Sequence, residues 1–103
     1  ISDGRMKPLV QGLDVDVFFS SLLDKEISYD LRMSPSLVSA GYRYDVSIVE
    51  AITEEEYELV KNTLGNMKDI SLKELKLTGG IDTKILVVYS VRDCIYFRMS
   101  MKG

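Results

Sequence analysis

A chain of 103 residues, of which 46% are hydrophobic and 28% charged, has the composition of one folded domain and excludes a disordered or fibrous protein. Its net charge of −3 argues against binding to nucleic-acid phosphates, and its lack of histidine removes the side chain best suited to proton transfer near neutral pH. The apolar runs fall far short of the ~20 residues that a membrane helix needs.

The single cysteine cannot form an internal disulfide, and residues 1–5 show no pattern of a secretory or transit peptide. We therefore expect the protein to be cytoplasmic. One cysteine without histidine also excludes structural zinc, a Cys-His nucleophile and a Ser-His-Asp triad. The sequence thus predicts a protein that is not an enzyme and that holds no cofactor and no metal ion.

Charge is unevenly distributed along the chain. The first 60 residues carry 12 acids and 5 bases, a net charge of −7, whereas the rest carry 4 acids and 8 bases, a net charge of +4. One interpretation is that the two halves interleave in one sheet and neutralise each other across strands. The other is a surface with two oppositely charged faces, which selects a partner or promotes self-association.

The chain begins with a segment of little periodicity. Gly4, Pro8 and Gly12 interrupt residues 1–12, which we predict to be a flexible arm or an edge strand. Residues 13–103 are predicted to form a single α+β domain.

Residues 14–23 fit two patterns. As a strand they place Val15, Val17 and Phe19 on one face. The β-branched valines and the adjacent phenylalanines favour this interpretation. As a helix the segment has an equally regular apolar stripe, formed by Val15, Phe18, Phe19, Leu22 and Leu23.

Residues 26–34 alternate between apolar and polar side chains, which predicts a strand with one solvent-facing side. Pro35 is expected to end it, because proline lacks the amide that a ladder requires. If the preceding segment is also a strand, Asp24 and Lys25 form the tight turn between the two. The apolar side contains Ile27, Tyr29, Leu31 and Met33.

The clearest local signals lie in the middle of the chain. Residues 42–48 alternate with the period of a half-buried strand. Thr53 and Glu56 then have the spacing of a capping box, in which each side chain accepts a hydrogen bond from the other residue's amide. Gly65 is predicted to end the helix in the left-handed conformation. The sequence therefore predicts a strand followed by a short helix over about residues 54–64.

Residues 70–77 again have two interpretations. Alternating leucines indicate a strand, whereas Ser71 and Glu74 repeat the spacing of a capping box and would start a helix. We favour the strand, because the glycine-containing residues 78–82 have the character of a hairpin loop. That loop leads into the apolar run of residues 85–89, which suits a strand covered on both faces.

Residues 94–101 form the last predicted strand. Its core-facing set is Ile95, Phe97, Met99 and Met101, and its opposite set is Cys94, Tyr96, Arg98 and Ser100. The cysteine is expected to be a small, buried or half-buried side chain, and a redox-active or dimer-forming disulfide is the alternative.

Two weaker patterns are explained without a ligand. Asp14 and Asp16 would share one strand face, but they lack the oxygen-rich loop of a calcium site and are expected to be solvated. Gly79 and Gly80 precede Lys84, but not at the spacing of a phosphate-binding loop, so a hairpin turn accounts for them.

Aromatic and basic residues interleave in two of the predicted strands, at residues 42–44 and 96–98. Such side chains can stack on unpaired bases, but the acidic total weakens attraction to phosphates, so nucleic acid is an unfavourable partner. Tyrosine and arginine are also enriched at protein interfaces. We predict Tyr96, Arg98 and Arg43 as binding residues.

Taken together, the elements predict an α+β fold in which one short helix packs on one face of an antiparallel sheet of five or six strands. The missing catalytic side chains, the split charge and the apolar strands with edges to cover favour a non-catalytic protein-interaction or regulatory module. It would bind a protein partner, or a second copy as a homodimer, through a sheet face or an edge strand. The alternatives are a small-ligand or nucleotide-binding domain of a larger protein and, third, a single-stranded nucleic-acid binder or an enzyme. No membrane partner is expected.

Overall fold

The structure is a computed structural model and describes residues 15–37, 40–68, 70–76, 82–90 and 93–102. The elements follow the order α1 (Val15–Leu23), β1 (Tyr29–Pro35), β2 (Tyr42–Ile48), α2 (Glu54–Gly65), β3 (Ser71–Lys76), β4 (Thr83–Tyr89) and β5 (Cys94–Ser100). The predicted arm of residues 1–12, Asp14 and the Gly79-Gly80 pair lie outside the described residues. No helix in the described ranges is long and apolar enough to span a membrane.

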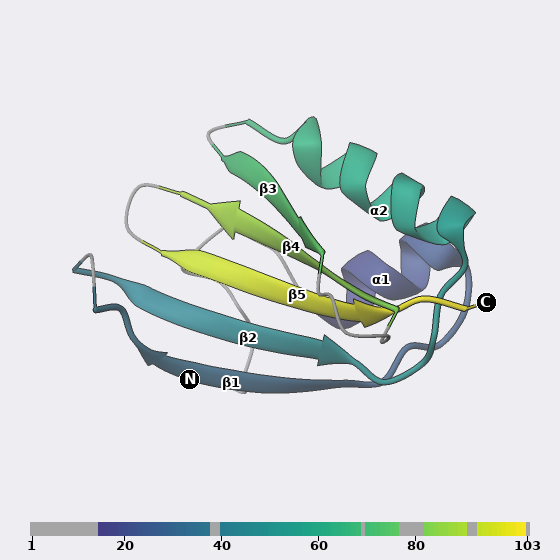
Figure 1. Cartoon of the computed structure of the whole chain (residues 1–103), viewed down its shortest axis with the longest axis horizontal. Coiled ribbons are helices and arrows are strands. Elements are labelled where there is room, and N and C mark those ends of the chain that lie inside the picture. The colour runs from purple at the N-terminus through teal and green to yellow at the C-terminus, as the bar shows by residue number, and fades with distance from the viewer. Residues whose placement is uncertain (1–14, 38–39, 69, 77–81, 91–92, 103) are drawn as a thin grey trace.

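Five strands form one sheet in the order β1-β2-β5-β4-β3 (Figure 1). The α+β class is confirmed, but the prediction of an antiparallel sheet is wrong, because β2 and β5 pair in parallel while the other neighbours are antiparallel. A parallel pair requires a crossover connection. Here α2, β3 and β4 form that connection, so β5 enters the sheet beside β2 in the same direction.

Both helices pack on one face of the sheet, and the core lies between the two layers (Figure 1). Phe19 of α1 meets Phe97 of β5 with the ring centroids 5.6 Å apart and the rings inclined at 64°. This edge-to-face arrangement is favourable, because the partly positive edge of one ring meets the negative face of the other. The buried residues of the core cluster are Val15, Phe19, Leu23, Ile27, Tyr44, Val46, Ile48, Ile52, Tyr57, Val60, Leu64, Leu86, Val88, Ile95, Phe97 and Met99.

The first described segment is a helix, so the strand favoured for residues 14–23 is wrong. Val15 and Phe19, four residues apart, are buried, whereas Val17 between them is 61% exposed. A strand would have placed all three on one face. Docking of this helix against the sheet therefore outweighs the β-propensity of the valines. Asp24 follows the helix with φ 57°, a left-handed residue at a helix end rather than part of the expected hairpin turn.

The capping box at the start of α2 is confirmed. The hydroxyl of Thr53 accepts a hydrogen bond from the amide of Glu56 at 3.1 Å, and the Glu56 carboxylate accepts one from the Thr53 amide at 2.9 Å. The hydrogen bond from the Thr53 amide lowers the pKa of Glu56, because it stabilises the charged form. The helix that follows matches the predicted residues 54–64 to within one residue.

Gly65 does not end α2 in the predicted left-handed conformation. It is the last helical residue, and Asn66 caps the helix with φ −95°. A Cβ atom on Gly65 would lie 3.6 Å from Cδ2 of Leu72, an ordinary contact. We expect Gly65→Ala to raise the free energy of unfolding by about 0.5–1 kcal/mol, because alanine has less backbone entropy to lose on folding. Urea denaturation measures this change, and a lower midpoint for the variant would contradict it.

The remaining segments predicted as strands are strands, but β1 begins at Tyr29 rather than at residue 26 and includes Pro35. Met33, predicted on its apolar side, is 59% exposed. β3 resolves the ambiguity of residues 70–77 in favour of a strand, and the four consecutive residues 85–88 of β4 are all buried, as a strand covered on both faces requires. In β2, Tyr44 is buried as expected, but Tyr42 is 42% exposed. The reason is visible in Figure 1, where β2 begins at the end of the sheet far from both helices.

Candidate functional site

The face of the sheet that the helices leave uncovered carries the polar side chains of β1, β2 and β5. Strand alternation turns these residues away from the core. The register then places Arg32 opposite Asp45, and Asp45 opposite Tyr96. The set consists of Asp30, Arg32 and Ser34 from β1, Arg43, Asp45 and Ser47 from β2, and Cys94, Tyr96 and Arg98 from β5.

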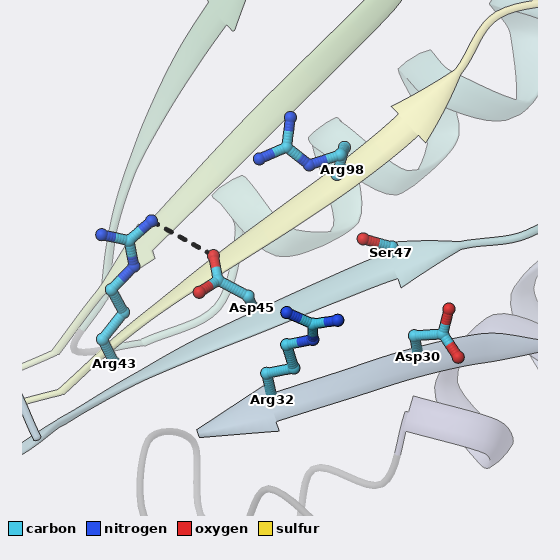
Figure 2. A pocket seen from close by; sticks show the side chains of 6 residues that line it. All are labelled: Asp30, Arg32, Arg43, Asp45, Ser47 and Arg98. Atoms are coloured by element: carbon cyan, nitrogen blue, oxygen red, sulfur yellow. Dashed lines mark hydrogen bonds and ion pairs between the residues drawn. The ribbon is translucent and has the colours of Figure 1, made fainter. Parts of the chain in front are cut away.

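Six of the described residues line a hollow of about 300 Å³ on this face, which we call the arginine hollow (Figure 2). Arg43 donates a hydrogen bond to Oδ1 of Asp45 at 3.2 Å. Within the described ranges, Arg32 and Arg98 make no ion pair or side-chain hydrogen bond. Among the described residues of the lining, three arginines and two aspartates give a formal charge of +1. Its lining is Asp30, Arg32, Arg43, Asp45, Ser47 and Arg98.

A second hollow, of about 590 Å³, lies where β1 ends, and we call it the apolar hollow. Leu37 in its wall is 100% exposed. The guanidinium carbon of Arg43 lies 4.1 Å from the ring centroid of Tyr96, a cation–π contact. Because Arg43 lines both hollows, the two adjoin. The apolar hollow is lined by Ser34, Pro35, Ser36, Leu37, Arg43, Cys94 and Tyr96.

All three residues predicted from the sequence lie on this face. Arg43 contacts Tyr96, and Arg43 and Arg98 line the arginine hollow together. Arg32 and Ser47 were not among the predicted binding residues. Alternation in residues 26–34 already indicated that Arg32 faces solvent, but its neighbours follow only from the strand order, to which no local pattern points.

Cys94 is half-buried in the apolar hollow, in agreement with the sequence expectation for a small side chain of this kind. Burial raises the pKa of the Cys94 thiol, and the positive charge of Arg43 opposes that effect only in part. The thiolate is the reactive form of cysteine. The side chain is therefore a protonated thiol at neutral pH and serves as part of an apolar wall.

The described residues of the two hollows together offer guanidinium groups, hydroxyl groups and an apolar surface. Among the residues that the structure describes, acidic and cysteine side chains form no group of three that could hold a metal ion. No family model, curated protein or solved structure matches this chain.

Proposed function

We propose that the protein is a non-catalytic interaction module that binds a segment of a partner protein across the two adjoining hollows. The observation that carries this proposal is the position of Arg43, which lines both the arginine hollow and the apolar hollow. A single bound segment would therefore meet an apolar surface and a cationic surface side by side.

The apolar hollow supplies the anchoring half of the surface. Leu37 is fully exposed, and Tyr96 and Pro35 lie in the same wall. Covering such a surface with a large apolar side chain removes apolar area from water, which is the main favourable term in association. Tyrosine and arginine are also the residue types that contribute most at protein interfaces.

The arginine hollow supplies the selective half. Its excess positive charge and its two arginines without an ion pair among the described residues are complementary to carboxylates. The occupant is therefore a segment with one large apolar residue followed or preceded by acidic residues. Basic segments would be repelled, because the unpaired guanidinium groups would face like charge.

Fluorescence anisotropy with labelled short peptides tests this proposal. One series carries a leucine beside aspartates and glutamates, and a matched series carries lysines in place of the acids. We expect the acidic series to bind and Arg43→Glu to weaken binding at least about tenfold, since the substitution alters both hollows and reverses a charge. Lys68→Glu makes the same charge change at an exposed residue outside both hollows and should leave affinity unaltered.

Two results would contradict the proposal. One is that no acidic peptide binds, or that peptides bind Arg43→Glu as well as the unaltered chain. The other is a dimer, detected by sedimentation of the chain alone, that Arg43→Glu dissociates. That result would make a second copy the occupant of this face in place of an acidic segment.

A further inference from the structure

We infer that the arginine hollow binds a phosphate group carried by the partner segment. This inference rests on the proposed function and specifies its ligand. Three arginines from three neighbouring strands line a hollow of about 300 Å³, and Figure 2 shows their side chains above the sheet around Asp45 and Ser47.

Two of the three arginines in the hollow can bind a ligand, because an aspartate already pairs with the third. Asp45 is committed to Arg43 by the hydrogen bond at 3.2 Å. Arg32 and Arg98 are both exposed, and neither has an ion-pair partner in the described part of the chain. Asp30 offsets one of these charges, so the described lining keeps a formal charge of +1 that attracts an anion.

The placement of the donors favours a tetrahedral group over a planar carboxylate. Arg32 lies on β1 and Arg98 on β5, the two strands that flank β2, and Ser47 lies opposite Arg98 on β2 between them. A carboxylate presents two oxygens in one plane. A phosphate monoester presents three strong acceptor oxygens and a charge of about −1.5 to −2 at neutral pH. It can therefore accept hydrogen bonds from both guanidinium groups and from the hydroxyl together.

The adjoining apolar hollow favours a phosphate attached to a polypeptide over free phosphate. Free phosphate would use only the arginine hollow and would leave Leu37 and Tyr96 uncovered. A phosphorylated side chain with an apolar residue nearby in its sequence would occupy both hollows in one binding event. Linking two weak contacts in one ligand raises affinity well above that of either alone.

Anisotropy and amide NMR titrations test the inference on the whole chain. The probes are inorganic phosphate and three matched labelled peptides, each with one leucine, that carry phosphoserine, serine or aspartate at several spacings from it. We expect phosphoserine to raise affinity at least about tenfold over serine and to exceed aspartate. Inorganic phosphate should shift the amide signals of Arg32, Ser47 and Arg98 at higher concentration.

Two variants serve as the matched test of the arginines. Arg32→Gln and Arg98→Gln each remove one guanidinium group. Each should abolish most of the gain in affinity that phosphoserine gives over serine. Both side chains are exposed, so thermal unfolding should show them folded. Lys68→Gln removes the same charge from an exposed residue outside the hollow and should retain the gain.

The failure of this inference can be distinguished from that of the proposed function. If phosphoserine, aspartate and serine peptides bind equally and all respond to Arg43→Glu, the phosphate inference is overturned and the interaction module remains. If inorganic phosphate binds in the hollow and phosphopeptides bind no more tightly than it does, the inference that the phosphate is carried by a polypeptide is overturned. If no peptide binds, both proposals fail.

Discussion

Replacing Phe97 by alanine is expected to lower the free energy of unfolding by about 3–5 kcal/mol. Phe97 lies at the centre of β5 and is fully buried. It packs against Phe19 of α1, and the register places it beside Val46 of β2 and Leu86 of β4. Truncation removes an aromatic ring from the junction of a helix with three strands and leaves a cavity there.

The expected loss is a large fraction of the stability of a domain of this size. Domains of this length have free energies of unfolding of roughly 5–15 kcal/mol. Each kcal/mol corresponds to about 4–8 °C in the midpoint of thermal unfolding for a chain of this size. We therefore expect the midpoint for Phe97→Ala to fall by about 12–40 °C when thermal unfolding is followed by circular dichroism.

Phe18→Ala is the matched control, because it makes the same chemical change at a half-buried site. Phe18 contacts Phe19 with the ring centroids 5.1 Å apart but lies at the margin of the core. Its truncation removes less apolar area from burial, so we expect a loss of only about 1–2 kcal/mol. If the two variants lose equal stability, the core is not centred where the structure places it.

Phe97 also orients the proposed site. It lies between Tyr96 and Arg98, and in a strand neighbouring side chains point to opposite faces. A shift of β5 by one residue would turn both site residues into the core and expose the phenylalanine. Burial of Phe97 therefore keeps the tyrosine and the arginine on the open face, beside Arg43.

Local signals in the sequence predict local structure in this protein. The capping box of Thr53 and Glu56 and the alternation in residues 42–48 each depend on neighbours along the chain, and the structure confirms both. Residues 14–23 show the limit of such signals. The segment fits a strand and a helix equally well, and only the sheet against which Phe19 packs decides between them.

The parallel pairing of β2 and β5 could not be predicted from local patterns. The pair is separated by α2, β3 and β4, and the register that places Arg43 opposite Cys94 follows from the path of that connection. The alternation of apolar and polar residues was sufficient to predict that Tyr96 and Arg98 point away from the core. It was not sufficient to show that Arg32 lies in the same hollow as Arg98, because that depends on the order of strands in the sheet.

A second large effect is expected at Tyr57, which joins α2 to β3. Tyr57 is fully buried, and its hydroxyl donates a hydrogen bond to the carboxylate of Glu74. Nζ of Lys61 lies 3.6 Å from Oε1 of the same carboxylate. Nζ of Lys84 lies 4.5 Å from the centroid of the Tyr57 ring and forms an ion pair with Oε2 of Glu54 at 3.0 Å. One phenol thus lies at the centre of a charged cluster at the edge of the core.

We expect Tyr57→Phe to lower the free energy of unfolding by about 1.5–3 kcal/mol at neutral pH, because it removes a hydrogen bond to a charged group. Urea denaturation of the two chains measures the loss. Tyr89→Phe is the control, since Tyr89 is 38% exposed and makes no side-chain hydrogen bond in the described part of the chain. It should change stability by less than about 0.5 kcal/mol.

The same pair predicts how stability depends on alkaline pH. Burial, followed by the hydrogen bond to Glu74 and its charge, raises the pKa of Tyr57 above that of an unfolded tyrosine, ~10. A group whose pKa is higher in the folded state contributes stability that is fully present below the unfolded pKa and is lost as pH rises toward the folded value. Phenylalanine has no proton to lose. The difference in free energy of unfolding between the unaltered chain and Tyr57→Phe should therefore narrow above pH ~10. A difference that stays constant would mean that folding does not raise the pKa of this phenol.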